Sequence, residues 1–368
     1  MKIIHVIPNL NKGGAERLVQ DICTEIYKRN SHEIKLITFG ELPSKHTNLP
    51  FHQHINSSFS PSITSRSVIK VESLQQFIVN YKPDIIHSHL WKTEILLTKI
   101  NSGSALRISH VHDNISQLTK IKFPLKKTEL TNLYERKIFF KKNSNNFICI
   151  SNDTLKFAKR VLPKKKHSKT HLLPNAINYN SFFSKKKKKH DKINLINIGS
   201  FVPKKNQIFA LKILKKIIDL GHPAKLTFLG DGPLKKSIKN QTKKLKLENH
   251  VIFMGNVENV TDYLENSNIY LHTAHYEPFG LVLLEAMAGG LPVVSLDGGG
   301  NRDFINNDEN GYLLNNENQD EFANKIIKLF YDKIKYKKFV QNGHTTAKKH
   351  DIKNYVDRLL EIYLKARH

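Results

Sequence analysis

The chain has 368 residues and a mass of 42.4 kDa, more than one ordinary domain of about 100 to 200 residues, so we expect two domains. Hydrophobic residues make up 39% and charged residues 25%, with 17 glycines and 13 prolines, which excludes collagen-like, disulfide-rich and wholly disordered proteins. The net charge of +27 favours anionic partners: nucleic acid, acidic lipid headgroups or phosphorylated substrates.

The first half of the chain alternates short β-rich runs with helical periods. The runs are residues 3–7, 33–39, 84–88, 107–112 and 147–150. After the first run, apolar residues recur at the spacing of one buried helix face, at Ala15, Leu18, Val19, Ile22, Cys23 and Ile26. This βαβ repetition predicts a parallel, doubly wound sheet.

The second half repeats the pattern, with strands expected at residues 193–198, 226–229, 251–254, 269–272 and 293–296. The lysine run at residues 184–190 repels itself and predicts a solvated interdomain linker. We therefore predict two Rossmann-like domains, over residues 1–185 and 190–349. A terminal amphipathic helix is expected within residues 350–368. By resemblance to related folds, it is expected to complete the first domain.

Targeting signals are not evident. The first fourteen residues lack the long apolar region of a secretory signal, and the nearly apolar residues 279–296 contain Glu285 and, near their end, two glycines and a proline. We expect no membrane span and a cytoplasmic protein. Cys23 and Cys149 have no paired spacing typical of zinc or a redox dithiol, so both are expected to be buried.

Two loops have the composition of ligand sites. Gly13 and Gly14 stand directly between the first strand and the first helix, where backbone N–H groups and a helix N-terminus favour phosphate. The loop is not a GxGxxG fingerprint, so a nicotinamide cofactor is poorly supported. Farther on, Glu277 and Glu285 flank Phe279-Gly280-Leu281, which predicts a helix start. Eight positions are slightly over two helical turns, so both carboxylates can face one side.

Four histidines alternate on two predicted strand ends, at His87, His89, His110 and His112. Within each pair both side chains point to one face of the sheet. The strand-end position favours a ligand-binding role for His112 and leaves His89 open between a binding and a structural role. We expect no bound metal, because no Cys or carboxylate spacing accompanies these histidines.

The ordered set of motifs resembles the retaining glycosyltransferases of family 4, which have the two-domain GT-B fold. The resemblance covers nearly the whole chain and rests on Gly13-Gly14-Ala15-Glu16, Asp84-Ile-Ile-His-Ser-His89, His110-Val-His-Asp113, Leu173-Pro-Asn-Ala176, residues 199–206, Leu229-Gly-Asp-Gly-Pro233 and the paired-glutamate segment followed by Gly299-Gly300.

The resemblance implies a role for several residues. Glu285 is similar to the glutamate that binds the nucleotide ribose, and Glu277 to the one beside the donor sugar. Lys205 and Gly14 resemble the groups next to the diphosphate, and His112 resembles the histidine that reaches the donor sugar and its phosphate. Gly13, Phe279, Gly280 and Leu281 are expected to complete the donor site. His89 is a weaker candidate for binding the acceptor.

Three positions depart from the family pattern. Ser200 stands where the family commonly has an arginine, so one diphosphate cation is missing unless Lys204 replaces it. Ala274 stands where the family has a serine, and Asp303 where it has a glutamate. Neither of these last two changes removes the groups expected to carry the chemistry.

The implied function is transfer of a hexose or N-acetylhexosamine from a nucleoside diphosphate sugar, UDP favoured, to a lipid-linked or oligosaccharide acceptor in bacterial polysaccharide biosynthesis, of lipopolysaccharide or capsule type. The anomeric configuration is retained, and neither metal nor cofactor is required. Residues 120–169 hold fifteen basic and three acidic residues, which suggests peripheral contact with acidic lipid at the inner face of the cell membrane.

Two alternatives stay open. A polyanion-binding protein would explain the charge, but no RRM, KH, zinc-finger or helix-turn-helix pattern accompanies it, so no specific nucleic acid is expected. A noncatalytic GT-B subunit is suggested by Ser200. The presence of both Glu277 and Glu285 argues against that second alternative.

Overall fold

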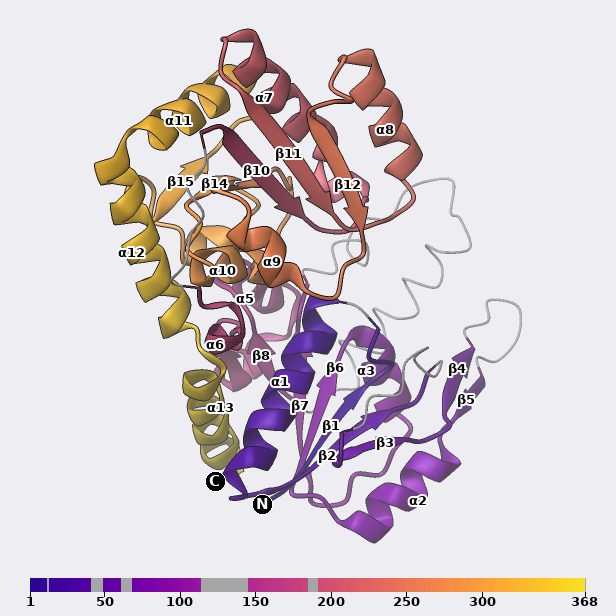
Figure 1. The fold of residues 1–368 in the computed structure, drawn as a ribbon. Coiled ribbons are helices and arrows are strands. Elements are labelled where there is room, and N and C mark those ends of the chain that lie inside the picture. Colours follow the sequence, from indigo (N-terminus) through magenta and orange to yellow (C-terminus); the bar gives the residue numbers. More distant parts are fainter. Residues whose placement is uncertain (12, 41–48, 61–67, 114–144, 185–190, 368) are drawn as a thin grey trace. The chain divides into compact units, whose positions relative to one another are not determined.

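The computed structural model describes residues 1–11, 13–40, 49–60, 68–113, 145–184 and 191–367. It divides into two compact units (Figure 1). Unit 1 comprises Met1–Ala176 and Ile352–His368, and unit 2 comprises Ile177–Asp351. Each unit contains its own parallel sheet, in agreement with the predicted pair of Rossmann-like domains.

The sheet of unit 1 has seven strands in the order β3-β2-β1-β6-β7-β8-β9, all paired in parallel. Their bounds are β1 Lys2–Ile7, β2 Glu33–Thr38, β3 His52–His54, β6 Ile85–His89, β7 Leu106–Val111, β8 Asn146–Cys149 and β9 Thr170–Leu172. A separate antiparallel pair is formed by β4 (Ser58–Ser60) and β5 (Val68–Lys70). The helices are α1 Gly14–Arg29, α2 Glu72–Tyr81, α3 Trp91–Leu97, α5 Asn152–Val161 and α13 Ile352–Arg367, with a 3-10 helix at Lys164–Lys169.

Helix α1 forms where the apolar spacing predicts it. Its buried residues include Leu18, Val19, Ile22 and Cys23, all on the face turned to the sheet. The helix ends at Asn30, which adopts the left-handed conformation (φ 50°) that asparagine tolerates better than most residues.

Helix α13 returns to unit 1 and shares one hydrophobic core with α1 and the sheet. Its side chains Ile352, Tyr355, Val356, Leu359 and Tyr363 are buried in that core. The C-terminal segment therefore lies where the sequence led us to expect it, with the N-terminal sheet.

The sheet of unit 2 has six parallel strands in the order β12-β11-β10-β13-β14-β15. Their bounds are β10 Ile193–Ile198, β11 Ala224–Leu229, β12 Val251–Gly255, β13 Ile269–His272, β14 Val293–Leu296 and β15 Gly311–Leu314. The helices are α6 Tyr179–Phe182, α7 Gln207–Asp219, α8 Lys235–Lys244, α9 Val260–Glu265, α10 Leu281–Ala288, α11 Gln319–Tyr331 and α12 Lys333–Lys349, with 3-10 helices at Pro203–Lys205 and Gly300–Asp303. Successive strands are added towards one edge of the sheet from β10 to β12, and towards the other edge from β13 to β15. Ligands usually bind where this order reverses, here between β10 and β13.

The domain boundary differs from the prediction. We expected the change of domain at the lysine run, of which residues 185–190 lie outside the described part of the chain. The division instead falls after Ala176, because the residues that follow pack within unit 2. Tyr179 and Phe182 of α6 are buried there, and α6 lies against α10. A run of lysines predicts a stretch that does not enter a hydrophobic core. It does not predict where the chain passes from one unit to the other.

Among the described residues, none of the helices is both long enough and apolar enough to span a membrane. Cys23 and Cys149 are free and buried, as predicted.

Leu359 tests whether α13 is part of the core of unit 1. Its side chain is fully buried, so Leu359→Ala should lower the free energy of unfolding by about 2–5 kcal/mol, through lost burial and a residual cavity. Leu364, on the same helix, is 49% exposed, and Leu364→Ala should change it by less than about 0.5 kcal/mol. Urea unfolding followed by fluorescence of the single tryptophan, Trp91 in α3, reports on unit 1. Equal effects of the two substitutions would refute this role of α13.

Candidate active site

The loops after three neighbouring strands of unit 2 meet at one edge of the sheet. Lys205 follows β10, Glu277 follows β13, and the glycines 298–300 follow β14. Backbone bonds join the loops: His275 N donates to Lys204 O over 2.9 Å. Strand order thus assembles residues that are far apart in sequence.

Lys205 and Glu277 form an ion pair at this edge. Lys205 Nζ lies 2.5 Å from Glu277 Oε2, and His272 Nε2 lies 3.1 Å from the same oxygen. Both side chains are largely buried, at 18% and 10% exposed. The sequence assigned Lys205 and Glu277 to one site, and the structure places them in direct contact.

The pair determines the charge of Glu277. Burial by itself raises the pKa of this carboxyl, but the Lys205 cation and the adjacent ring of His272 together hold it well below its ordinary value. Burial lowers the pKa of His272, and the carboxylate only partly opposes this. At neutral pH Glu277 is therefore an ionised hydrogen-bond acceptor beside a neutral imidazole.

The glycine run holds the backbone of Glu277 in place. Glu277 N donates to Gly298 O, and Gly300 N donates to Glu277 O, each over 2.8 Å. A Cβ on Gly300 would lie 1.9 Å from Pro278 O, so only glycine permits this approach.

Helix α10 begins where Phe279-Gly280-Leu281 predicts. Gly280 caps it with φ 104°, a left-handed conformation that favours glycine, and Leu281 is its first residue. The side chain of Phe279 is 1% exposed and packs against Phe304 and His350, so its backbone is the part available to a ligand.

Glu285 lies inside α10 and is 5% exposed. Burial raises the pKa of Tyr270, and the negative charges of Glu277 and Glu285 raise it further. Both carboxylates are therefore electrostatic neighbours of one buried phenol. Neither is the solvated surface residue that a helical glutamate often is.

The positions that depart from the family pattern lie beside this cluster. Ser200 is exposed after β10, and Ala274 is fully buried after β13. Lys204 Nζ lies over the ring of Tyr276, 5.7 Å from its centroid. Lys204 is thus a second cation on the loop that carries Lys205.

In unit 1, Gly13 and Gly14 open helix α1, as predicted. Gly13 is the N-cap in an extended conformation. The side chain of Glu16 folds back over it, so that a Cβ on Gly13 would lie 2.1 Å from Glu16 Oε2. A carboxylate thus rests at a helix N-terminus, which itself favours negative charge.

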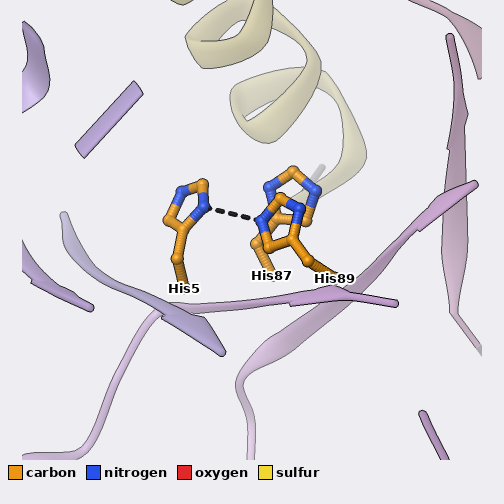
Figure 2. A group of neighbouring side chains, drawn as sticks. All are labelled: His5, His87 and His89. Carbon is orange, nitrogen blue, oxygen red and sulfur yellow. Dashed lines mark hydrogen bonds between the residues drawn. The ribbon is translucent and has the colours of Figure 1, made fainter. Parts of the chain in front are cut away.

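The pairing of parallel strands places five histidines of unit 1 next to one another. His5 of β1 pairs with His87 of β6, and His89 of β6 pairs with His110 of β7. His112 follows β7, and its ring stacks on His110 with centroids 4.1 Å apart. Figure 2 shows His5, His87 and His89 with their rings together. His5 was absent from the predicted set, because a single polar residue in an apolar strand gives no signal of its strand neighbours.

Burial keeps these imidazoles neutral. It lowers the pKa of His5 and of His112 to about 3, and lowers that of His87, His89 and His110 still more clearly, with the other histidines adding to the effect. Ring nitrogens of His5, His87 and His89 lie within 4.8 Å of one another, as do those of His89, His110 and His112. The spacing alone would suit a metal ion, which sequence reasoning did not expect.

The neutral histidines make the stability of unit 1 depend on pH. Below pH 6.5 the unfolded chain binds protons that the folded unit excludes, so stability should fall as pH falls from 6.5 towards 3. The urea midpoint followed by Trp91 fluorescence should be lower at about pH 5.5 than at about pH 7.5. A constant midpoint would contradict the buried neutral cluster.

His110 provides the matched variant. Both of its ring nitrogens lack a hydrogen-bond partner among the described residues, so His110→Phe removes a proton-binding group without breaking a hydrogen bond there. In His110→Phe, the slope of the unfolding free energy against pH should be smaller by the contribution of one proton, about 1.4 kcal/mol for each pH unit of that window.

Two family models cover almost all of this chain. Residues 12–181 match the model described as "Glycosyltransferase Family 4", and residues 178–346 match the model described as "Glycosyl transferases group 1". The matches meet within a few residues of the boundary between the two units.

Several proteins with similar sequences are named as glycosyltransferases. The chain is 24% identical to the putative glycosyltransferase EpsF of Bacillus subtilis, over 80% of this chain and 79% of that protein. It is 23% identical to the UDP-Gal:alpha-D-GlcNAc-diphosphoundecaprenol alpha-1,3-galactosyltransferase of Escherichia coli, over 79% and 78%. A match at 29% identity to the poly(glycerol-phosphate) alpha-glucosyltransferase of Bacillus subtilis spans 45% of this chain and only 25% of that protein.

Solved structures share the fold across the full length. Anabaena HepE, crystallised in complex with UDP and glucose, superposes with a TM-score of 0.76 at 18% identity and covers 99% of this chain and 100% of its own. WaaG, a glycosyltransferase involved in lipopolysaccharide biosynthesis, gives 0.77 at 16% identity, covering 98% and 99%. With a family 4 model over its first half, a group 1 model over its second and a GT-B fold throughout, the chain belongs to the glycosyltransferases.

Proposed function

We propose that this chain is a retaining glycosyltransferase that transfers a hexose or N-acetylhexosamine from a nucleoside diphosphate sugar to a lipid-linked or oligosaccharide acceptor in bacterial polysaccharide biosynthesis. The observation that carries the proposal is the buried Lys205–Glu277 pair at the reversal of strand order in unit 2. A fixed cation and a fixed carboxylate at that position suit a ligand with both phosphate and hydroxyl groups.

Lys205 would offset the negative charge that the departing diphosphate gains in the transition state. Its ammonium is already held by Glu277, so little reorganisation is needed when the phosphate arrives. Glu277 is ionised and accepts hydrogen bonds, which suits contact with sugar hydroxyls and not proton donation. Glu285 would bind the nucleotide ribose, while Gly13, Gly14, Gly280 and Leu281 would supply backbone groups.

UDP is the favoured nucleotide. The Escherichia coli relative is named for a UDP-Gal donor and a diphosphoundecaprenol acceptor, and HepE has been crystallised with UDP and with UDP-glucose. His112 would contact the donor sugar, and His89 is the weaker candidate for the acceptor. The reaction would need no metal and no cofactor, because protein groups supply positioning and charge.

Contact with an acidic membrane through residues 120–169 is part of the proposal, since a lipid-linked acceptor would lie there. Residues 120–144 of that region fall outside the described residues. The described remainder includes the exposed Lys164 and Lys165 of the 3-10 helix at Lys164–Lys169.

Calorimetric titration with UDP, GDP and ADP tests the donor site. One diphosphate should bind at micromolar concentration, and Glu285→Ala should weaken it at least about tenfold, or about 1.4 kcal/mol, because the ribose loses its acceptor. Glu321→Ala, which removes an exposed glutamate on α11, should leave the affinity unchanged. If no diphosphate binds, or if Glu285→Ala binds as wild type does, the assignment fails and a noncatalytic or polyanion-binding protein takes its place.

The stereochemistry and metal requirement are tested on the product. The anomeric proton of the transferred sugar, observed by NMR, should report the same configuration as in the donor. The initial rate should be the same in excess EDTA as in excess Mg²⁺. An inverted product, or activity that EDTA abolishes and Mg²⁺ or Mn²⁺ restores, would disprove the proposed mechanism.

A further inference from the structure

An unbroken series of hydrogen bonds runs through unit 1, from His112 after β7 to His87 in β6. His112 Nε2 lies 3.0 Å from His89 Nδ1, and His89 Nε2 lies 2.9 Å from His5 Nδ1. His5 Nε2 lies 3.2 Å from the hydroxyl of Tyr363, and that hydroxyl lies 2.6 Å from His87 Nδ1. His112 is half-buried and the other four side chains are fully buried. The dashed bond in Figure 2 is the step between His5 and His89.

The series couples the tautomers of its members. A neutral imidazole has one nitrogen that donates and one that accepts. Because His89 and His5 use both of their nitrogens, the proton position on one ring determines the position on the next. All the bonds between the rings must therefore run in one direction. When the Tyr363 hydroxyl also donates its proton within the series, two arrangements of protons exist.

The two distances at Tyr363 select one arrangement. Hydroxyl donors make bonds of about 2.5–3.0 Å, and N–H donors make bonds of about 2.7–3.2 Å. At 2.6 Å the contact with His87 fits O–H donation by Tyr363, and at 3.2 Å the contact with His5 fits N–H donation to the hydroxyl oxygen. His5 then carries its proton on Nε2, and so in turn do His89 and His112.

The opposite arrangement has one advantage. His87 Nε2 is buried and has no partner within the described segments, and an unpaired lone pair costs less there than an unpaired N–H. However, it would require the N–H of His87 to donate over 2.6 Å and the hydroxyl to donate over 3.2 Å, outside both usual ranges. The two hydrogen-bond lengths therefore outweigh one unpaired nitrogen.

We propose that this directed series, ending at Tyr363 and His87, holds His112 as the Nε2–H tautomer, so that its Nδ1 lone pair accepts a hydrogen bond from a sugar hydroxyl of the substrate. The substrate contact rests on the proposed function. His112 is thereby specific for a hydroxyl donor and is not a ligand of the phosphate, which offers only acceptor oxygens. Tyr363, His5 and His89 are positioning residues that act through His112.

A metal ion at the same nitrogens is the competing explanation, and the geometry disfavours it. The rings of His87 and His89 stack with centroids 4.3 Å apart and planes at 28°, so their in-plane lone pairs run side by side and do not converge. Within the described residues, burial and other histidines shift the pKa values of His87, His89 and His110, with no carboxylate among the causes to offset a dication.

Long-range ¹H–¹⁵N NMR of the full chain labelled with ¹⁵N-histidine measures the tautomers, with signals assigned by single histidine substitutions. In the wild type, His5, His89 and His112 should each carry the proton on Nε2. In Tyr363→Phe, the proton should move to Nδ1 on all three, because His5 Nε2–H would otherwise be buried without an acceptor.

Tyr355→Phe is the matched control. Tyr355 lies on the same helix, and its buried hydroxyl has no hydrogen-bond partner in the described part of the chain, so its removal should leave all three tautomers as in the wild type. The wild-type spectrum alone can overturn the proposal, if His112 carries its proton on Nδ1 or differs from His5. An unchanged His112 in a folded Tyr363→Phe variant would also overturn it. So would one tightly bound zinc per purified chain whose removal changes the ring-nitrogen signals of His5 and His89.

Ligand titrations separate this inference from the proposed function. A UDP-sugar that binds should shift the Nδ1 signal of His112, tested with UDP-glucose, UDP-galactose and UDP-N-acetylglucosamine, whereas UDP alone should not. A shift with UDP alone would overturn the hydroxyl contact. If none of these compounds binds in calorimetry, the proposed donor fails, while the tautomer measurement still decides the directed series.

Discussion

The reversal of strand order at the middle of each sheet is the constraint on which the remaining features depend. In unit 2 the chain builds outward from β10 through β11 to β12 and then returns to β13 on the other side. In unit 1 the same reversal separates β1 from β6. The connections after these neighbouring strands run in opposite directions, so their loops do not cover the strand ends. Lys205, Glu277 and the Gly13 loop all lie at these ends.

Burial has opposite consequences for the two clusters at the strand ends. Glu277 is buried beside Lys205, whose charge keeps the carboxylate ionised. The histidines of unit 1 are buried beside one another, so burial keeps them uncharged. One cluster therefore presents fixed charge, which suits phosphate and hydroxyl groups. The other presents oriented N–H groups and lone pairs, whose direction follows from which hydrogen bonds its members make.

Close backbone approach explains the glycines that surround the charged pair. Gly298 and Gly300 lie so near the backbone of Glu277 and Pro278 that any side chain would collide with it. Two backbone hydrogen bonds then fix Glu277 on both sides. A rigid loop holds the carboxylate in one orientation, so less conformational entropy is lost when it contacts a ligand.

The sequence by itself determined the fold class, most strands of both sheets, helices α1 and α13, the start of α10 and the residues of the Lys205–Glu277 pair. These features follow from local periodicity, from glycines at turns and from ordered motifs. The strands β3 and β9 escaped prediction because each has only three residues, and β15 because its four residues begin with a glycine. The domain boundary escaped prediction because packing of α6, and not charge, sets it. Only the tertiary structure joined His5 and Tyr363 to the other histidines. Strand register and the return of α13 bring together residues up to 358 positions apart, and no local pattern encodes that contact.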